Sequence, residues 1–421
     1  MTVAAPHPAT QSWNFGRHVA LSSGWFGFNF HWLPIGFILI QSQVRDLVPR
    51  GSEGTSIGVA VGLGGIFAVT VPPLVGYLSD RLNTPWGRRR PILAAGVVLN
   101  LVGLAVMGTA TTYVQLVIGY LLIQLFNNAA GAAYAGIIPD VVRDEEFGKA
   151  SGFLAAMNNL GGILGVGAAL LMSSLHQIRL TYAVIGVVIV LAIIPVLWVS
   201  KGEGMNVVAR RPHQPLAATV REFLAPLTHG DFAWVIFTRL MITAGINIVA
   251  YFLSPFFRDV VHVANPDSFT STWLLVVFVA AIPFGFFGGT ISDRYGRKPF
   301  VYGSGAFQGL VAVFFILVFT HNVVLVTALG AVYGLGYGLY YAVDWALACD
   351  TLPDRENPAK DMGLFHAAYT FPQVVVPLLG GLVLDAVNKQ SAGGGYRAVF
   401  AISIVFFALG TFFVSRIRSV R

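Results

Sequence analysis

The sequence predicts an all-α membrane protein with twelve transmembrane helices in two pseudo-symmetric six-helix bundles. Hydrophobic residues make up 56% of the 421 residues, and charged residues make up only 11%. A soluble chain carries roughly 25% charged residues, so a surface this poor in charge suits lipid rather than water. Apolar residues gather in runs long enough to cross a bilayer, and one loop pattern occurs once in each half of the chain.

The apolar runs define the predicted helices. A bilayer core about 30 Å thick requires about 20 apolar residues in a helix that rises about 1.5 Å per residue. None of the runs alternates as a strand of an outer-membrane barrel does. The predicted spans are 19–41, 55–79, 91–110, 113–138, 150–173, 180–200, 232–256, 270–292, 299–319, 322–349, 361–387 and 396–415.

The start of the chain does not read as a cleaved leader. Residues 1–16 contain no basic stretch, and no convincing cleavage site follows, so we expect the first span to remain in the protein. We expect an N-terminal six-helix bundle over residues 1–200 and a C-terminal one over 231–421. A basic, proline-containing cytoplasmic linker over 201–230 joins them.

The distribution of basic residues predicts the orientation. Nineteen of the 26 Lys and Arg residues lie on one side of the predicted spans, six lie on the other, and Arg239 lies within a span. Basic residues accumulate on the cytoplasmic side, so both termini are expected in the cytoplasm and the protein in the cell (inner) membrane. The net charge of +7 therefore reflects topology, and we expect no nucleic-acid partner.

One loop pattern occurs twice at a constant offset. The loop after the second span contains G-x-x-S-D-R followed by G-R-R-R, and the loop after the eighth contains G-x-x-S-D-R-x-G-R-K. Asp80 and Asp293 hold the same place in the two copies, 213 residues apart. A second pair, Asp140 and Asp350, is 210 residues apart and lies after the fourth and tenth spans. The shared offset indicates a duplicated six-helix unit.

These loops resemble the signature loop of the major facilitator superfamily. The resemblance implies two six-helix bundles that rock about a central site lined by helices 1, 4, 7 and 10. Carboxylates at helix ends can contact a helix N-terminus or an arginine in one conformation and lose the contact in the other. We expect gating by such residues, and a static topological anchor is the alternative. The expected gating residues are Asp80, Arg81, Arg88, Asp140, Asp293, Arg294, Arg297 and Asp350.

A finer resemblance concerns the long first loop and the fourth helix. The loop 79–91 and the segment from Gln124 to Asp140 are similar to those of plant sucrose transporters and the related glycoside–pentoside–hexuronide group. The resemblance implies a sugar-type cavity. The chain departs from the pattern in two places, because Gln124 stands where that group has an aspartate and Ala135 where it has an arginine. That aspartate is implicated in proton coupling in those transporters, so the departure at Gln124 argues against coupling through this helix.

Two ionisable residues lie deep within predicted spans. Arg239 is eight residues beyond Asp231, or about 12 Å, and Asp344 is six residues before Asp350, or about 9 Å. Separate burial of each charge costs far more than a hydrogen-bonded pair, so we expect the two to pair. The pair has three readings: a proton switch at Asp344, a static ion pair, or an Arg239 site for an anionic substrate.

Other polar residues form stripes on the predicted cavity helices. Amide and aromatic groups suit a neutral polyhydroxylated ligand, and the alternative is that they bridge or pack helices. The expected substrate-binding residues are Asn29, Trp32, Gln124, Asn127, Asn128, Asn247, Tyr337, Tyr341, Tyr369 and Gln373. His31 is a further coupling candidate, for which a simple helix contact is the alternative.

Together these features predict a secondary active transporter that works by alternating access. We expect cation-coupled, most simply proton-coupled, symport of a sugar or glycoside by a monomer. The alternative is a proton-coupled efflux antiporter of drugs or metabolites. No phosphate-binding loop or hydrolase motif occurs and Cys349 is the single cysteine, so we expect no enzyme activity, cofactor or metal site.

Overall fold

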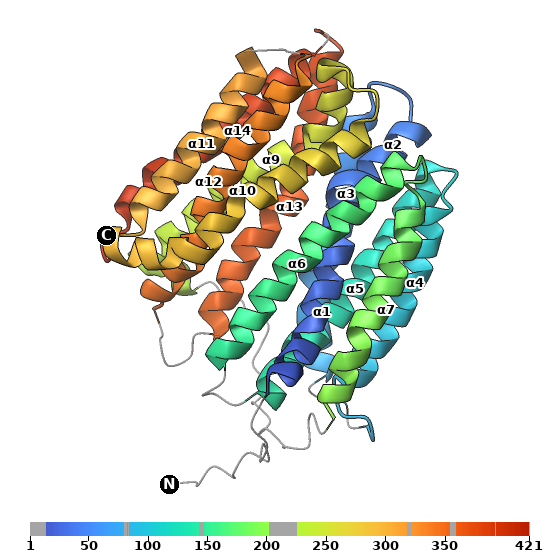
Figure 1. Cartoon of the computed structure of the whole chain (residues 1–421), viewed down its shortest axis with the longest axis vertical. Coiled ribbons are helices and arrows are strands. Elements are labelled where there is room, and N and C mark those ends of the chain that lie inside the picture. The colour runs from blue at the N-terminus through green and yellow to red at the C-terminus, as the bar shows by residue number, and fades with distance from the viewer. Residues whose placement is uncertain are drawn as a thin grey trace. The chain divides into compact units, whose positions relative to one another are not determined.

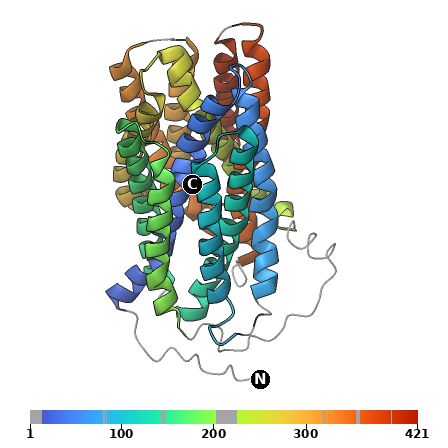
Figure 2. The same ribbon diagram turned by 90° about the vertical axis from the view of Figure 1, so that its right-hand side faces the viewer.

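The computed structural model describes residues 14–79, 82, 84–142, 147–201, 225–317, 321–353, 359–391 and 393–420. These residues form helices joined by short connections, and no strand occurs among them (Figures 1 and 2). Eleven of the helices are long and apolar enough to cross a membrane. The predicted all-α class is confirmed, and the chain is a multi-pass membrane protein.

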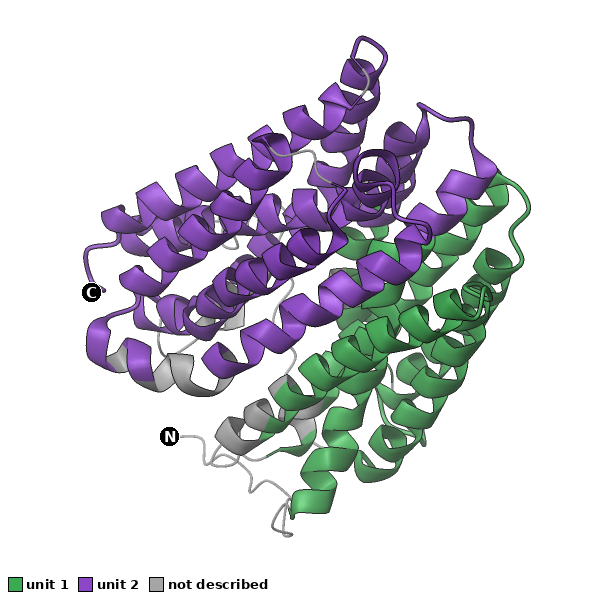
Figure 3. Ribbon diagram, turned by 45° about the horizontal axis from the view of Figure 1, so that its top comes forward, with its two compact units in different colours: residues 1–39, 66–211 green, residues 40–65, 212–421 purple. Residues whose placement is uncertain are grey.

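The described chain divides into two compact units, which Figure 3 distinguishes by colour. Unit 1 comprises residues 1–39 and 66–211, and unit 2 comprises residues 40–65 and 212–421. Helix α3 (Glu53–Ser79) therefore contributes its first part to unit 2 and its remainder to unit 1.

Unit 1 contains five further helical segments besides part of α3. These are α1 (Phe15–Pro34) with the π-turn η1 (Ile35–Leu39), α4 (Arg90–Gly108), α5 (Tyr113–Val141), α6 (Phe147–Ser174) and α7 (Leu180–Val199). Helix α1 packs on α6 and α7, and α4 packs on α5. The predicted span 19–41 coincides with α1 and η1 and reaches into α2.

Glycine allows a close contact between α6 and α1. A Cβ on Gly165 of α6 would lie 2.6 Å from the carbonyl oxygen of Phe30 on α1, so only glycine lets the two backbones meet there. A Cβ on Gly167 of the same helix would meet nothing within 4 Å, so that glycine takes no part in a close approach.

Unit 2 contains the remaining helices. They are α2 (Ile40–Leu47), η3 (Ala225–Thr228), α9 (Gly230–Phe256), η4 (Phe257–Val261), α10 (Pro266–Tyr295), α11 (Lys298–Leu317), α12 (Val323–Asp350), α13 (Ala359–Asn388), α14 (Gly394–Phe413) and η5 (Val414–Arg416). Asparagine caps fix two of the helix starts. Asn265 accepts a hydrogen bond from the Ser268 amide (3.0 Å), and Asn322 accepts one from the Leu325 amide (3.1 Å).

Helix α9 lies at the centre of unit 2. In its most apolar stretch 83% of the residues are buried, against 33–44% in the other spanning helices. Those other helices keep large apolar residues exposed, among them Leu310, Leu379 and Val405, as helices in contact with lipid do. The polar residues Arg239, Thr243 and Asn247 of α9 are themselves buried.

Candidate functional site

An ion pair joins α9 to α12 inside unit 2. Nη1 of Arg239 donates a hydrogen bond to Oδ2 of Asp344, and both residues are buried. The pairing predicted from the depths of the two residues within their spans is thus present in the structure. Two buried charges stabilise each other only when they are in contact, and removal of either would leave the other uncompensated.

Aromatic rings enclose the guanidinium of Arg239. Its Cζ lies 3.6 Å from the ring centroid of Phe365 and 5.3 Å from that of Tyr369, both on α13. A cation over an aromatic face is attracted by the ring quadrupole, most strongly where water is excluded. Nε of Arg239 is buried without a hydrogen-bond partner in the part of the chain that the structure describes. The arginine therefore retains a free donor beside its ion pair.

Two tyrosines of α12, Tyr337 and Tyr341, precede Asp344 on the same helix. The rings of Tyr337 and Tyr341 lie 4.5 Å apart between centroids, and both residues are half-buried. Tyr369 lies within hydrogen-bonding reach of Tyr341 and of Gln373, one turn further along α13. We call Arg239, Asp344, Tyr337, Tyr341, Tyr369 and Gln373 the α9–α12–α13 cluster.

Some polar residues of the predicted cavity helices belong to this cluster, and others only pack or bond with neighbouring residues. Tyr333 packs against Trp273 of α10, with 5.4 Å between ring centroids, and so lies outside the cluster. Asn247 donates its side-chain amide to the carbonyl of Thr243 (2.7 Å), and Thr243 in turn donates to the carbonyl of Arg239. Asn247, an expected substrate-binding residue, is therefore linked to Arg239 by a chain of hydrogen bonds along α9.

Three of the candidate amides in unit 1 bond within that unit. Asn29 donates to the carbonyl of Trp25 (3.3 Å) and to the side chain of Asn158 on α6. Gln124 donates to the hydroxyl of Tyr120 (2.7 Å), and Asn128 donates to the side-chain oxygen of Gln124 (2.8 Å). Of these contacts, the one between Asn29 and Asn158 bridges two helices, whereas those of Gln124 and Asn128 lie within α5.

Asn127, His31 and Trp32 are the other candidates in unit 1. Asn127 is 1% exposed, and both polar atoms of its amide lack a hydrogen-bond partner among the described residues. An unsatisfied buried amide is costly, so Asn127 keeps polar atoms with which a ligand could bond. His31 is fully buried beside Asn100, and its ring lies edge-on to Trp32, with 4.9 Å between centroids.

Part of the expected gating set lies outside the described residues, namely Asp80, Arg81 and the side chains of Asp140 and Asp293. Arg88 is half-buried in the bend before α4.

The gating residues of unit 2 that the structure describes lie near the ends of α10, α11 and α12. Arg294 is exposed near the end of α10. Arg297 donates to Asp350 at the end of α12 (2.5 Å) and to Ser292 of α10 (3.0 Å). Arg297 therefore ties three helix ends together.

A second charged group in unit 2 was missed by sequence reasoning. Asp267 of α10 accepts hydrogen bonds from Arg45 (2.7 and 3.1 Å) and Ser42 (2.6 Å) of α2. Arg258 of η4 donates to Glu53 at the start of α3 (2.5 Å). Burial lowers the pKa of the Arg45 guanidinium, but the hydrogen bonds and charge of Asp267 outweigh it, so that pKa is raised above its usual value.

Asp385 of α13 completes this group. Its carboxylate accepts hydrogen bonds from the backbone amides of Gly54 (3.2 Å) and Thr55 (2.6 Å), and so caps the N-terminus of α3 from another helix. We call the contacts of Asp267, Glu53 and Asp385 the carboxylate contacts. One sequence signal pointed to them: Arg45 and Arg258 are among the six basic residues on the less basic side of the predicted spans, close to acidic residues at the same helix ends.

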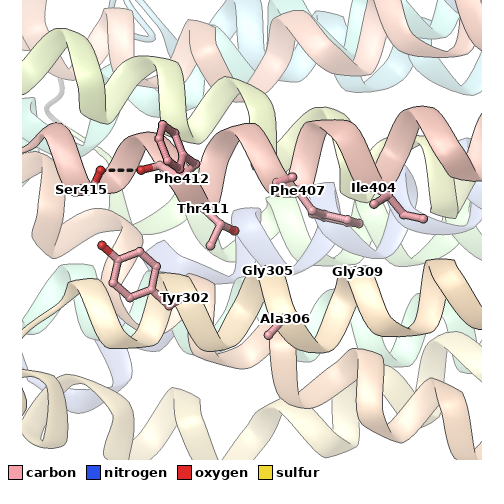
Figure 4. Close-up of a pocket in the computed structure, with 10 residues that line it drawn as sticks. Tyr302, Gly305, Ala306, Gly309, Ile404, Phe407, Thr411, Phe412 and Ser415 are labelled. Atoms are coloured by element: carbon pink, nitrogen blue, oxygen red, sulfur yellow. Dashed lines mark hydrogen bonds between the residues drawn. The ribbon is translucent and has the colours of Figure 1, made fainter.

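A cavity of about 500 Å³ opens between α11 and α14 in unit 2. Figure 4 shows Tyr302, Gly305 and Gly309 of α11 facing Phe407 and Thr411 of α14. Its lining is almost entirely apolar and includes none of the expected substrate-binding, coupling or gating residues. We therefore place the candidate site at the α9–α12–α13 cluster.

Comparison with known proteins decides the family. The model of the Major Facilitator Superfamily matches residues 19–279 and 264–421. The chain belongs to the Major Facilitator Superfamily. The resemblance of its two signature loops is thereby confirmed, and family membership indicates a membrane transporter rather than an enzyme.

Curated relatives come from two functional groups. The chain is 31% identical to the multidrug resistance protein MdtL of Escherichia fergusonii over 132 residues, or 31% of this chain and 32% of that protein. It is 26% identical to the sucrose transport protein SUC4 of Arabidopsis thaliana over 157 residues, or 33% of this chain and 30% of that protein. The chain therefore spans about a third of the length of these curated relatives.

Solved structures share the fold along nearly the whole chain. The nucleoside transporter NupG aligns with a TM-score of 0.69 and 15% identity, covering 96% of this chain and 100% of that one. A bacterial homologue of the human lysosomal transporter Spinster, in an inward-facing and unoccupied conformation, aligns with a TM-score of 0.72 and 14% identity, covering 97% and 98%. Identities this low support the major facilitator fold alone.

Proposed function

We propose that this protein is a secondary active transporter that carries a sugar or glycoside together with a proton by alternating access. The observation that carries the proposal is the buried Arg239–Asp344 ion pair. Arg239 lies on α9, the most enclosed helix of unit 2, and tyrosines and Gln373 of α12 and α13 lie around the pair. Ionisable residues inside membrane segments are expensive and mark ion or substrate pathways.

Coupling follows from the charge balance of the pair. With Asp344 ionised, the pair is neutral overall and Arg239 is held on α12. A proton bound to Asp344 leaves Arg239 as an unmatched positive charge and weakens its contact. Arg239 can then turn its donors toward a substrate oxygen. Proton binding and substrate binding would thus favour each other, which is what symport requires.

The chemistry of the cluster suits a polyhydroxylated ligand. Tyrosine hydroxyls both donate and accept, and the Gln373 amide offers two donors and an acceptor. The half-buried rings of Tyr337, Tyr341 and Tyr369 offer flat apolar faces for the C–H faces of a sugar ring. The similarity to a plant sucrose transport protein supports the same substrate class.

Efflux of drugs or metabolites by proton antiport is the second candidate. It is favoured by the similarity to a multidrug resistance protein and by the replacement of the expected acidic residue with Gln124. In that case the aromatic faces bind the apolar part of the ligand, and Asp344 releases its proton when it binds a cationic ligand.

Gating and orientation complete the proposal. The carboxylate contacts join residues 40–65 to α10, η4 and α13, and we propose that they must open in one step of the transport cycle. The excess of basic residues assigns the ends that carry Arg297 and Asp350 to the cytoplasm of a cell (inner) membrane. The carboxylate contacts then lie on the opposite side.

Counterflow in proteoliposomes tests the substrate class. The purified protein is loaded with unlabelled sucrose, and entry of labelled sucrose is measured beside maltose, glucose and a lipophilic cation. Counterflow requires a working substrate site but no ion gradient, so a fault in coupling cannot hide a positive result. Sugar exchange supports the proposal. Exchange of the cation with no sugar exchanged would refute it in favour of efflux.

A further inference from the structure

Two histidines from distant parts of the chain stack against each other in unit 2. His262 follows η4, and His321 precedes the N-cap of α12, 59 residues later in the chain. Their rings are nearly parallel, with an interplanar angle of 20° and 4.9 Å between centroids. Both residues are exposed, so the pair faces outward rather than into the helix packing.

Backbone contacts fix the tautomer of both rings. Nδ1 of His262 lies 3.2 Å from the carbonyl oxygen of Arg258, and Nδ1 of His321 lies 3.3 Å from that of Val261. A carbonyl can only accept a hydrogen bond, so each neutral ring carries its proton on Nδ1 and keeps the lone pair of Nε2. Metal-binding histidines are held in this way, with one ring nitrogen donating to a carbonyl and the other free to ligate.

The backbone holds one of the two rings in place. His262 adopts a left-handed conformation (φ 59°), and its amide bonds to the carbonyl of Phe257, which ends the π-turn. Both Nδ1 atoms bond to carbonyls of one turn, η4, so both Nε2 atoms are available on the remaining side of the stacked rings.

We propose that His262 and His321 form a binding site for a borderline-soft divalent cation such as Zn²⁺. In a tetrahedral site with Zn–N bonds of about 2.0–2.1 Å, the two Nε2 atoms come to about 3.4 Å apart. The exposed rings reach that separation by tilting toward each other, and water fills the other positions. No cluster of three or more metal-ligating side chains occurs among the described residues, so the site has two protein ligands.

The site has a consequence for the fold that is separate from transport. A bound ion would join the end of the α9–η4 segment to the start of α12. It would lie near the backbone carbonyl of Arg258, whose guanidinium contacts Glu53 of α3. This inference goes beyond the proposed function, because the cation is neither the transported substrate nor the coupling proton.

Zinc binding by the detergent-purified protein, prepared without a histidine tag, tests the proposal. Titration calorimetry with ZnCl₂ is expected to give one site per chain, and His262→Asn or His321→Ala each weakens binding about tenfold or more. Asparagine at position 262 tolerates the left-handed backbone, so the variant is expected to fold. The matched control is His176→Asn, because His176 is also exposed and left-handed (φ 57°), and this variant keeps wild-type affinity.

X-ray absorption at the zinc edge supplies a readout that does not depend on variants. The proposal predicts two imidazole ligands at about 2.0–2.1 Å and oxygen in the remaining positions. Absence of zinc binding by the wild type, unchanged binding by both variants, or a sulfur ligand from Cys349 would each overturn it. No substrate is present in either measurement, so a failure of the transport proposal leaves both results interpretable.

Discussion

At the scale of single residues, the Arg239–Asp344 pair is the central feature of the proposed transport mechanism. The two side chains are buried against each other on α9 and α12, and each compensates the charge of the other. Removal of one member of a buried pair typically costs about 3–5 kcal/mol, whereas removal of both costs much less. The pair should therefore behave as one unit in stability measurements.

A double-mutant cycle measures this coupling. We expect Arg239→Gln and Asp344→Asn each to lower the melting temperature of the detergent-solubilised protein, because each leaves one buried charge uncompensated. The double variant should recover much of the loss. Asp46→Asn is the control, because the Asp46 side chain is 52% exposed, and it should change little. Additive losses in the double variant would show that the two charges do not depend on each other.

Tyr341 provides a prediction about substrate binding. Tyr341→Phe removes one hydroxyl from the α9–α12–α13 cluster and keeps the ring. A hydrogen bond to a ligand contributes about 0.5–1.5 kcal/mol, so the KM for sugar exchange should rise about two- to tenfold. Tyr333→Phe is the matched control on the same helix, since its ring packs on Trp273. Equal effects of the two changes would argue against a substrate contact at Tyr341.

Residue type predicted some of these contacts and not others. The depths of Arg239 and Asp344 in their spans could be counted from the sequence. Two opposite charges buried at similar depth compensate each other only if they are in contact, so the pairing could be predicted. The side-chain amides of Asn29 and Asn128 are groups that could bind a sugar. The sequence does not show that they already bond to Asn158 and Gln124. Lateral neighbours of a helix depend on packing, which apolar periodicity does not encode.

At the scale of elements, the helices were predicted closely because a spanning helix is a local property of the chain. The predicted span 232–256 corresponds to α9 (Gly230–Phe256), and 361–387 corresponds to α13 (Ala359–Asn388). The contacts made by the beginning of α3 were not predicted. They join residues more than 200 positions apart, and no motif links Glu53 to Arg258 or Gly54 to Asp385.

The carboxylate contacts yield a prediction about opening. Asp267→Asn weakens the bonds to Arg45, and Asp385→Ala removes the cap of α3, a loss of about 0.5–2 kcal/mol. Ile57 of α3 is 1% exposed, so a cysteine placed there in a Cys349→Ser background should react slowly with a water-soluble maleimide. Either change should accelerate that labelling severalfold, as measured by mass spectrometry. An unchanged labelling rate in both variants would remove these contacts from the gating proposal.

At the scale of the whole molecule, composition and charge established the class of the protein. An 11% charged content predicted a membrane protein, and the repeated loops predicted the family that the comparison confirms. Composition and loop motifs did not predict the substrate. Members of one fold differ in a few side chains of the binding site, and the relatives include both a sucrose transport protein and a multidrug resistance protein.

Orientation is a prediction at this scale. A green fluorescent protein fused after residue 421 should fluoresce in a bacterial host, because a cytoplasmic C-terminus lets the reporter fold. Alkaline phosphatase at the same position should be inactive, and phosphatase inserted at the exposed Gly51 turn should be active. The reverse pattern would place the basic loops outside the cell.

The most direct test of the central claim compares two modes of transport in the wild type and in Asp344→Asn. Labelled sucrose is followed in proteoliposomes, first by counterflow without a gradient and then under an inwardly directed pH gradient. We expect the wild type to show both, and Asp344→Asn to keep counterflow but no longer accumulate sucrose, since the residue that takes up the proton is gone. Gradient-driven accumulation at the wild-type level in Asp344→Asn would contradict the assignment of coupling to the Arg239–Asp344 pair.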